Sequence, residues 1–289
     1  MLPYTGMNGS KFFIEVAFAL CYNNIMTEQK NIDASRFEQA LADGEFEVYY
    51  QPVIHAVDQS CIGAEALLRW HHPEKGVLLP GSFMHYAVKC GMISKIDAWA
   101  LQRVISDFRS WYLTIGLRLL PVSVNIAGSG INETDVTSLI AILNKSALAR
   151  EFLTLEFTHN TLSDLSEQTK EQLMRLKRTG IRLAMDDFGS KGSAEGYLER
   201  FRIDTIKIDY QLTRRIVDTP DARSLSTDIV KTAHGFGQRV IAAGVETQEQ
   251  AEILKGIGCD GLQGFLFDAA LQADAFTEAY LKIHSGVSR

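Results

Sequence analysis

Cysteine is scarce in this sequence, and the few that are present form no pattern. The four cysteines, Cys21, Cys61, Cys90 and Cys259, lie far apart among 289 residues, and no two are separated by only two others. Zinc sites and disulfide frameworks need closer or more regular spacing. We therefore expect reduced thiols in the protein core and a cytoplasmic location.

Positive charge is not in excess either. Lys and Arg number 29 against 35 Asp and Glu, which gives a formal net charge of −6 and an isoelectric point near 5.7. Proteins that bind DNA or RNA directly usually carry a basic surface, so this balance argues against nucleic acid as a direct partner. A few local arginines or lysines and a metal ion are still sufficient to hold a small anionic ligand.

The sequence also lacks a hydrophobic run long enough to cross a bilayer. Its most apolar stretch, residues 12–22, contains Glu15 and is shorter than the ~20 residues that a spanning helix needs. The stretch follows Lys11 as in a signal sequence, but no small-residue cleavage site comes after it. We expect residues 1–30 to form an N-terminal extension, either packed on or outside a folded domain of residues 31–289.

What the sequence does contain is a regular alternation of short β-rich runs with longer segments of helical period. The length suits one large α/β barrel as well as two small domains, but no linker or low-complexity tract divides the chain. The pattern therefore predicts a modified TIM-type (β/α)₈ barrel, an α/β fold. The expected helices cover residues 94–111, 133–145, 166–178, 222–236 and 248–255. The expected strands are Phe46–Ile54, Cys61–Trp70, Leu117–Ile126, Phe152–Thr158, Ile181–Asp186, Thr205–Ile208, Arg239–Ala242 and Gly261–Phe265. The first two are close enough to form a hairpin, which makes the first strand antiparallel.

Polar residues occur within or at the ends of these apolar runs. Asp186 and Asp187 are adjacent where the fifth run meets a loop, and two ionised carboxylates side by side usually need a divalent cation or a shifted pKa. In a barrel the strand ends converge on one rim, so the set predicts a metal or phosphate site there. For any single residue, a structural hydrogen bond is the alternative. The other members of the set are Glu65, Asn125, Glu156, Lys207 and Gln263.

The same residues stand in short motifs whose order and spacing resemble the EAL domain, from about Phe37 to Phe267. These motifs are Tyr50-Gln51-Pro52, Glu65-Ala66-Leu67, Val124-Asn125, Leu155-Glu156-Phe157-Thr158, Asp186-Asp187-Phe188-Gly189, Lys207-Ile208-Asp209, Gly244-Val245-Glu246-Thr247 and Gln263-Gly264-Phe265. EAL domains are modified TIM barrels that bind the bacterial second messenger cyclic di-GMP. Active members hydrolyse it to linear pGpG with Mg²⁺ or Mn²⁺.

The resemblance implies a role for each matching residue. Glu65, Asn125, Glu156 and Asp186 would bind a first Mg²⁺ or Mn²⁺ ion, and Asp186 and Asp187 would bind a second. Lys207, Glu65 and Asp187 would take part in catalysis, with Lys207 holding the attacking water or the phosphate. Gln51, Leu67, Arg69, Asp209 and Gln263 would contact the dinucleotide. A guanidinium such as that of Arg69 suits a phosphate because it donates two parallel hydrogen bonds.

The chain departs from the family pattern beside this site. Active members have a glutamate, assigned as a general base or as a group that positions the second metal, where this chain has Ala243. Glu246 does not replace it, because in a strand its side chain would point to the opposite face. His159 stands at another usual glutamate, and Ser190-Lys191-Gly192 replaces a loop that in the family couples metal binding to dimerisation. These changes indicate a degenerate member.

Three functions remain open on this basis. The first is a receptor that binds cyclic di-GMP with weak or absent phosphodiesterase activity, in second-messenger signalling. The second is a phosphodiesterase with reduced activity, because losing a general base typically costs about 10²–10⁴-fold in rate. The third is a nucleotide-independent domain that binds a protein partner, such as a transcription or motility regulator. Homodimerisation is common in the family.

Overall fold

The computed structural model describes residues 33–116, 119–126, 133–146, 151–189 and 201–282. The predicted extension of residues 1–30 and the segment Ser190-Lys191-Gly192 lie outside these residues. Among the described residues, no helix combines the length and the apolar character needed to cross a bilayer.

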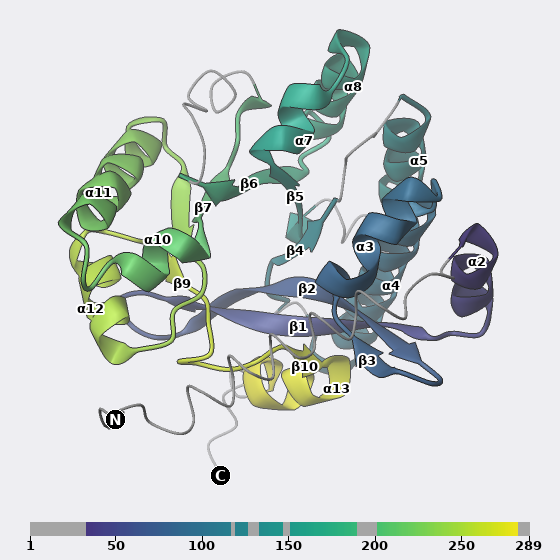
Figure 1. Ribbon diagram of the computed structural model, residues 1–289, viewed down its shortest axis with the longest axis horizontal. Helices are drawn as coiled ribbons and strands as arrows, with labels where there is room; N and C mark the ends of the chain where they lie inside the picture. The colour runs from purple at the N-terminus through teal and green to yellow at the C-terminus, as the bar shows by residue number, and fades with distance from the viewer. Residues whose placement is uncertain (1–32, 117–118, 127–132, 147–150, 190–200, 283–289) are drawn as a thin grey trace, which may run out of the picture.

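Eight strands close into the expected barrel (Figure 1). β1 runs antiparallel to both of its barrel neighbours, β2 and β9, whereas the remaining neighbours pair in parallel. The prediction of an α/β barrel with an antiparallel first strand is therefore confirmed, and each of the eight β-rich runs contains one strand. These strands are β1 (Phe46–His55), β2 (Cys61–His72), β4 (Val122–Asn125), β5 (Leu153–Thr158), β6 (Arg182–Phe188), β7 (Thr205–Ile208), β8 (Arg239–Ala242) and β9 (Gly261–Leu262).

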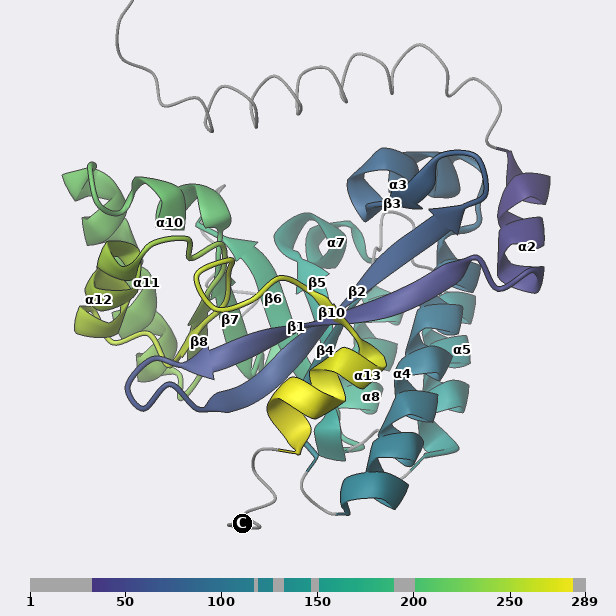
Figure 2. The same cartoon turned by 90° about the horizontal axis from the view of Figure 1, so that it is seen from below.

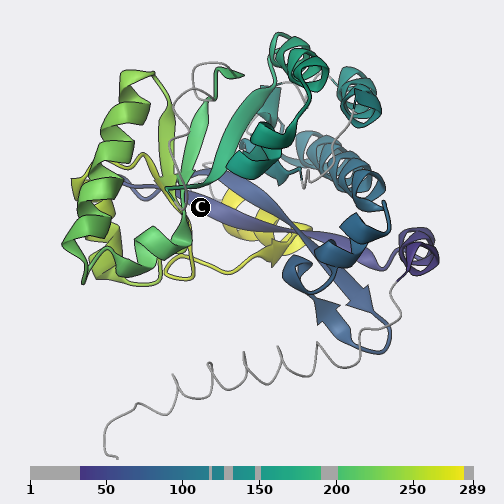
Figure 3. The same ribbon diagram turned by 45° about the horizontal axis from the view of Figure 1, so that its top comes forward.

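Helices surround the strands, with α11 and α12 on one side of the barrel and α4 and α5 on the other (Figure 3). The five predicted helices are present with bounds shifted by a few residues. Side-chain caps begin several of them, and Thr247 forms a full capping box with Gln250 at the start of α12. The helices are α4 (Ile93–Ile115), α5 (Glu133–Asn144), α7 (His159–Asp164), α8 (Glu167–Lys177), α10 (Tyr210–Arg215), α11 (Pro220–Gly235) and α12 (Gln248–Gly256).

A small lobe that the sequence did not predict stands beside the barrel. The β1–β2 hairpin extends out of the barrel toward α2 (Ala34–Ala42), β3 (Gly76–Leu78) and α3 (Pro80–Lys89) (Figure 2). Its separate apolar core stacks Phe37, Phe46, Trp70 and Phe83, whose ring centroids lie 5.3–6.5 Å apart. Near the end of the described residues, β10 (Leu271–Gln272) and α13 (Ala273–Phe276) pack against β1, and a π-helical turn (Thr277–Leu281) follows α13.

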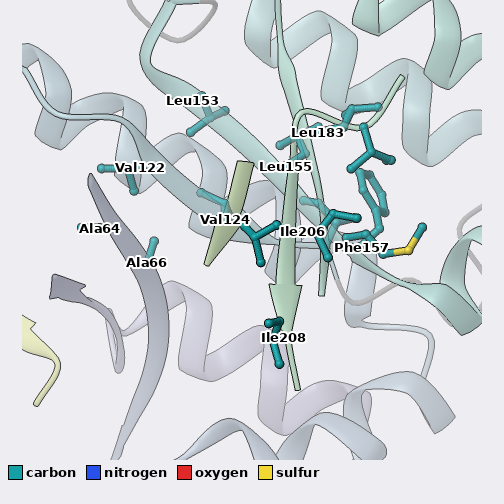
Figure 4. Packing of buried hydrophobic residues seen from close by; sticks show 14 of the residues in the cluster. Ala64, Ala66, Val122, Val124, Leu153, Leu155, Phe157, Leu183, Ile206 and Ile208 are labelled. Atoms are coloured by element: carbon teal, nitrogen blue, oxygen red, sulfur yellow. The ribbon is translucent and has the colours of Figure 1, made fainter. Parts of the chain in front are cut away.

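The parallel strands alternate apolar and polar side chains. The apolar ones join the large core, part of which Figure 4 shows: Ala64, Ala66, Val122, Val124, Leu153, Leu155, Phe157, Leu183, Ile206 and Ile208. The residues between them, such as Ser123, Thr154 and Thr205, line one cavity that residues of β1, β2 and β4–β8 all touch. Only the barrel interior can be touched by so many strands at once. The barrel interior therefore contains polar side chains beside apolar ones such as Ile62 and Ile241, whereas the outer face of the strands is apolar and packs against the helices.

Candidate functional site

Lys207 lies at the centre of the candidate site. Its ammonium nitrogen is 2.7 Å from Glu65 Oε2, 3.0 Å from Glu156 Oε2 and 3.7 Å from Asp186 Oδ1. Lys207, Glu65 and Glu156 are almost completely buried, whereas Asp186 is half-buried. A buried ammonium needs such partners, because an unpaired charge in this setting is very costly.

Strand register explains why these distant residues meet. Asn125 on β4 pairs directly with Glu156 on β5, and Glu65 on β2 pairs with Gln51 on β1. All of them occupy the inward-facing set of alternating positions near the carboxyl ends of the parallel strands. The predicted metal-ligand residues thus lie on one rim, as barrel geometry requires.

Amide side chains complete a hydrogen-bond network around Glu65. Asn125 Nδ2 donates to Glu65 Oε1 at 2.5 Å, and Gln263 Nε2 donates to Glu65 Oε2 at 2.8 Å and to Gln51 Oε1 at 3.2 Å. Gln51 Nε2 in turn donates to the backbone oxygen of Asp268 at 3.1 Å. Gln263 Oε1 is buried and has no hydrogen-bond partner among the described residues. This unsatisfied acceptor is a polar contact that a bound molecule can supply.

The electrostatics of the cluster follow from burial and from its mixed charges. Burial raises the pKa of Glu156 to about 8, with Glu65 and Asp186 acting in the same direction against Lys207. Burial also opposes ionisation of Glu65, but the Lys207 ammonium and the hydrogen-bond donors outweigh it and lower its pKa. Burial favours a neutral Lys207, yet the surrounding carboxylates raise its pKa well above the usual value. At neutral pH the cluster therefore contains a charged lysine, an ionised Glu65 and a largely protonated Glu156.

The adjacent Asp186 and Asp187 lie at an irregularity in the sheet. The pairing of β6 with β7 shifts register between Met185 and Phe188, and Asp187 has a left-handed backbone with φ of 55°. Aspartate adopts this conformation more readily than most residues. Asp187 is exposed on the rim, but partial removal of its carboxyl from water and the nearby Asp186 raise its pKa to about 6.

The other predicted ligand contacts lie at the rim or in the wall. Leu67 and Arg69 are half-buried on β2, and the Arg69 guanidinium lies 5.4 Å from the centroid of the Tyr49 ring. Burial lowers the pKa of Arg69. Asp209 caps helix α10 by accepting a hydrogen bond from the Gln211 backbone at 2.5 Å. This cap uses one carboxylate oxygen of a residue predicted to contact the dinucleotide.

The donor set fits a divalent cation in its chemistry. Glu65, Glu156 and Asp186 offer carboxyl oxygens and Asn125 an amide oxygen, which are ligands that Mg²⁺ and Mn²⁺ prefer, and a single ammonium faces the three carboxyl groups. In the described part of the chain, no three His, Cys, Asp or Glu side chains stand together as a preformed metal cage. The metal-ligand roles therefore stay predictions.

Ala243 follows β8 directly and continues its inward-facing positions. Ile241 and Arg239, two and four residues earlier, line the barrel interior, and the Ala243 backbone nitrogen donates to Ile208 O at 3.3 Å. Strand alternation thus places a methyl group at the rim beside Lys207, whose strand partner is Ile241. The expectation that Glu246 points to the opposite face of a strand was wrong, because β8 ends at Ala242 and Glu246 is exposed in the following loop. His159 begins α7 and is half-buried.

Two contributors were not identified from the sequence. Ser123 on β4 donates a hydrogen bond that stabilises the ionised form of Glu156, and the backbone of Asp268 accepts from Gln51. The alternation Val122-Ser123-Val124-Asn125 marks Ser123 as sharing a face with Asn125. No sequence signal marks a backbone acceptor such as that of Asp268.

Comparisons with known proteins agree with this geometry. A profile described as the EAL domain matches residues 34–270. Cyclic di-GMP phosphodiesterase NbdA of Pseudomonas aeruginosa is 32% identical over 274 residues, which cover 94% of this chain and 34% of NbdA. This chain spans about a third of the length of NbdA and of several other curated relatives.

Solved structures show the same similarity. The complex of PaMucR phosphodiesterase with cyclic di-GMP has a TM-score of 0.77 and 32% identity, covering 83% of this chain and 97% of that one. The EAL enzyme Bd1971, bound to cAMP and cyclic di-GMP, has a TM-score of 0.78 and 27% identity, covering 95% of this chain and 76% of that one. The chain belongs to the EAL domain family.

Proposed function

We propose that this chain binds cyclic di-GMP at the rim around Lys207 and hydrolyses it weakly or not at all. The observation that carries the proposal is Ala243, an inward-facing methyl group beside an otherwise intact cluster of Glu65, Asn125, Glu156 and Lys207. Binding and hydrolysis need different parts of this site. The charged groups of Glu65, Glu156 and Lys207 are retained, whereas the glutamate expected to accept a proton is replaced by Ala243.

Several groups support binding of a phosphodiester. Arg69 is half-buried at the rim, and its planar guanidinium matches two phosphate oxygens. The buried Gln263 Oε1 has no hydrogen-bond donor among the described residues, so a ligand can supply one. Gln51 is oriented by hydrogen bonds with Gln263 and with the Asp268 backbone. The relatives PaMucR and Bd1971 have been solved with cyclic di-GMP.

We expect Mg²⁺ or Mn²⁺ to be held by Glu65, Asn125, Glu156 and Asp186, with Asp187 the additional ligand for a second ion. When bound, such ions activate water and stabilise the departing oxygen of a phosphodiester. The chain's own residues position the phosphate: Lys207 supplies a fixed positive charge, and its carboxylate partners hold that charge at the rim. Gln263 and Asn125 keep Glu65 oriented.

The replacement at Ala243 supports low turnover. A general base must reach the proton of the attacking water, and a methyl group can neither accept a proton nor orient a donor. Within the described residues, the nearest acid downstream in this motif, Glu246, is exposed in a loop beyond β8. When a general base is removed, the remaining rate acceleration comes from positioning of the reactants and from electrostatic stabilisation of the transition state.

An active phosphodiesterase is the second candidate. It is favoured by the retained contacts of Lys207 with Glu65 and Glu156, the charged core of the site. A protein partner, a homodimer and a cytoplasmic location also remain proposals. The altered segment Ser190-Lys191-Gly192 bears on dimerisation but lies outside the described residues.

Two measurements test the proposal. Isothermal titration with cyclic di-GMP in Ca²⁺, an ion expected to support binding without turnover, should give saturable heat. Absence of heat in the micromolar range would reject nucleotide binding and leave the protein-interaction alternative. Release of pGpG in Mn²⁺ then separates the first two candidates, because turnover at rates typical of enzymes, about 1 s⁻¹ or faster, would show that the site does not need an acid at position 243.

A further inference from the structure

We propose that the opposite, amino-terminal mouth of the barrel binds a small tetrahedral oxyanion of the phosphate class through Arg182 and Arg239. This site goes beyond the proposed function and does not depend on it. It is built from residues at the starts of strands, whereas the cyclic di-GMP site is built at their ends.

A cavity opens at this end of the barrel. It has a volume of about 60 Å³ and is lined by residues of β1, β2 and β4–β8. Its wall includes the hydroxyl-bearing residues Ser123, Thr154 and Thr205, each at or near the first residue of its strand. At about 15 Å³ for each water-sized position, the space admits about four such positions, which is comparable to the four oxygens of phosphate.

The two arginines stand on either side of Thr205. Arg239 is its direct strand partner on β8, and Arg182 begins β6, two residues before Ala184, the partner on the other side. Both belong to the inward-facing set, and both line the cavity. Three neighbouring strands therefore bring two guanidinium groups and a hydroxyl to one edge of the same space.

These guanidinium groups retain donors for a ligand. Arg182 Nη2 donates to the Glu151 backbone oxygen at 2.6 Å, and its remaining N–H groups are not taken by that bond. Among the described residues, the Arg239 side chain has no ion pair and no hydrogen bond, although it lines the wall. Paired guanidinium groups match oxyanions because each can donate two parallel hydrogen bonds.

The acidic residues of the lining do not neutralise the arginines. Glu156, at the inner end, is engaged by Lys207 at 3.0 Å. Asp260 Oδ2 is contacted by His234 Nε2 at 2.9 Å and accepts from the Val240 backbone at 2.7 Å. With Glu156 engaged by Lys207, two guanidinium groups stand against the one remaining carboxyl group, that of Asp260, so the cavity keeps a positive edge in a protein whose net charge is −6. This local charge favours an anion over a cation.

Methyl NMR tests the site directly, because Ile241 and Ile62 line the cavity whereas Ile208 belongs to the apolar core outside it. Titration of the full chain with inorganic phosphate should shift the Ile241 and Ile62 methyl signals with saturation in the millimolar range. GMP and guanosine form a second arm. A shift with GMP but not guanosine would extend the site to nucleotide phosphates, whereas a shift with phosphate alone would restrict it to the free anion.

The variants are Arg239→Gln and the pair Arg182→Gln with Arg239→Gln, and the matched control is Arg175→Ala, an exposed arginine on α8. Each lost charge-assisted contact should weaken phosphate binding by about tenfold, and the control should leave it unchanged. Arg239 is itself exposed, so its single variant tests the site even where the double variant fails to fold. The proposal is overturned by non-saturable shifts in the unmodified chain, by shifts confined to Ile208, or by equal affinity in Arg239→Gln.

Discussion

Replacing Ala243 with glutamate should turn the site from binding toward hydrolysis. The residue follows Arg239 and Ile241 in the inward-facing set, and its backbone is held to Ile208 on β7, the strand that carries Lys207. Ala243→Glu therefore directs a carboxylate to the rim beside the buried cluster. The other acid of this motif, Glu246, is exposed in the loop that follows β8.

The expected gain is that of a general base. Such groups contribute about 10²–10⁴-fold in rate, or about 2.7–5.4 kcal/mol of barrier at 1.36 kcal/mol for each tenfold. The new charge has an opposite effect on metal-free stability. Coulomb's law at an effective dielectric of about 20 gives about 3 kcal/mol of repulsion for two like charges about 6 Å apart. Part of this is offset by the ammonium of Lys207, so a loss of about 1–2 kcal/mol is expected.

The assay measures pGpG release in Mn²⁺ for the unmodified chain, Ala243→Glu and the matched control Ala243→Gln. Glutamine has the size of glutamate but cannot serve as a base, so its rate should stay at that of the unmodified chain. Thermal melts should show that Mn²⁺ restores the stability that Ala243→Glu loses without metal. Equal rates for the glutamate and glutamine variants would refute the reasoning and shift attention to His159 or the segment 190–192.

Three further outcomes follow from the described contacts. Lys207→Met should lower the free energy of unfolding by about 3–5 kcal/mol in urea, because it leaves the buried, ionised Glu65 without its ammonium partner, and a loss below about 1 kcal/mol would contradict the central role of this lysine. Glu45 is half-buried, which opposes its ionisation, but hydrogen bonds from Arg36 and the indole of Trp70 lower its pKa below the usual value. Its stabilisation is therefore present above about pH 4.5 and lost as the pH falls through the lower folded value, so Glu45→Gln should flatten stability between about pH 5 and 3. A Cβ at Gly264 would overlap the backbone of Val245 in the loop between β8 and α12, so Gly264→Ala should cost about 3 kcal/mol or more in thermal melts. The matched control Gly256→Ala, at the open end of α12, should be neutral or slightly stabilising.

Local sequence predicted most of the barrel because its strands and helices have recognisable hydrophobic periodicity. Runs such as Leu153–Thr158 alternate apolar and polar residues, and the amphipathic segments between them carry helical period. The bounds were less accurate. In the described part of the predicted run Leu117–Ile126, which starts at residue 119, the strand covers only Val122–Asn125 and is preceded by Pro121, whose carbonyl accepts from Ala64 on β2. Proline cannot donate to a ladder, so it stands at the strand's edge.

The lobe could not be predicted in the same way. Its core joins Phe37, Phe46, Trp70 and Phe83, which come from two helices and two strands. Each of these segments is short and apolar, and its sequence has no periodicity that would distinguish a lobe residue from a residue of the barrel core. Only the extension of the β1–β2 hairpin beyond the barrel brings these rings together.

The sequence by itself determined which residues are candidates for the chemistry: a set of carboxylates, a lysine and amides in EAL motifs, and an alanine where a glutamate is usual. Side-chain identity and strand alternation are local properties, so they can be read from the chain. Tertiary structure alone decided that the ammonium of Lys207 lies between Glu65 and Glu156, residues 142 and 51 positions away. It also decided that Asp209 caps a helix and that two arginines share a cavity at the far mouth. These outcomes depend on register and barrel closure, which join residues distant in sequence through contacts that no single segment encodes.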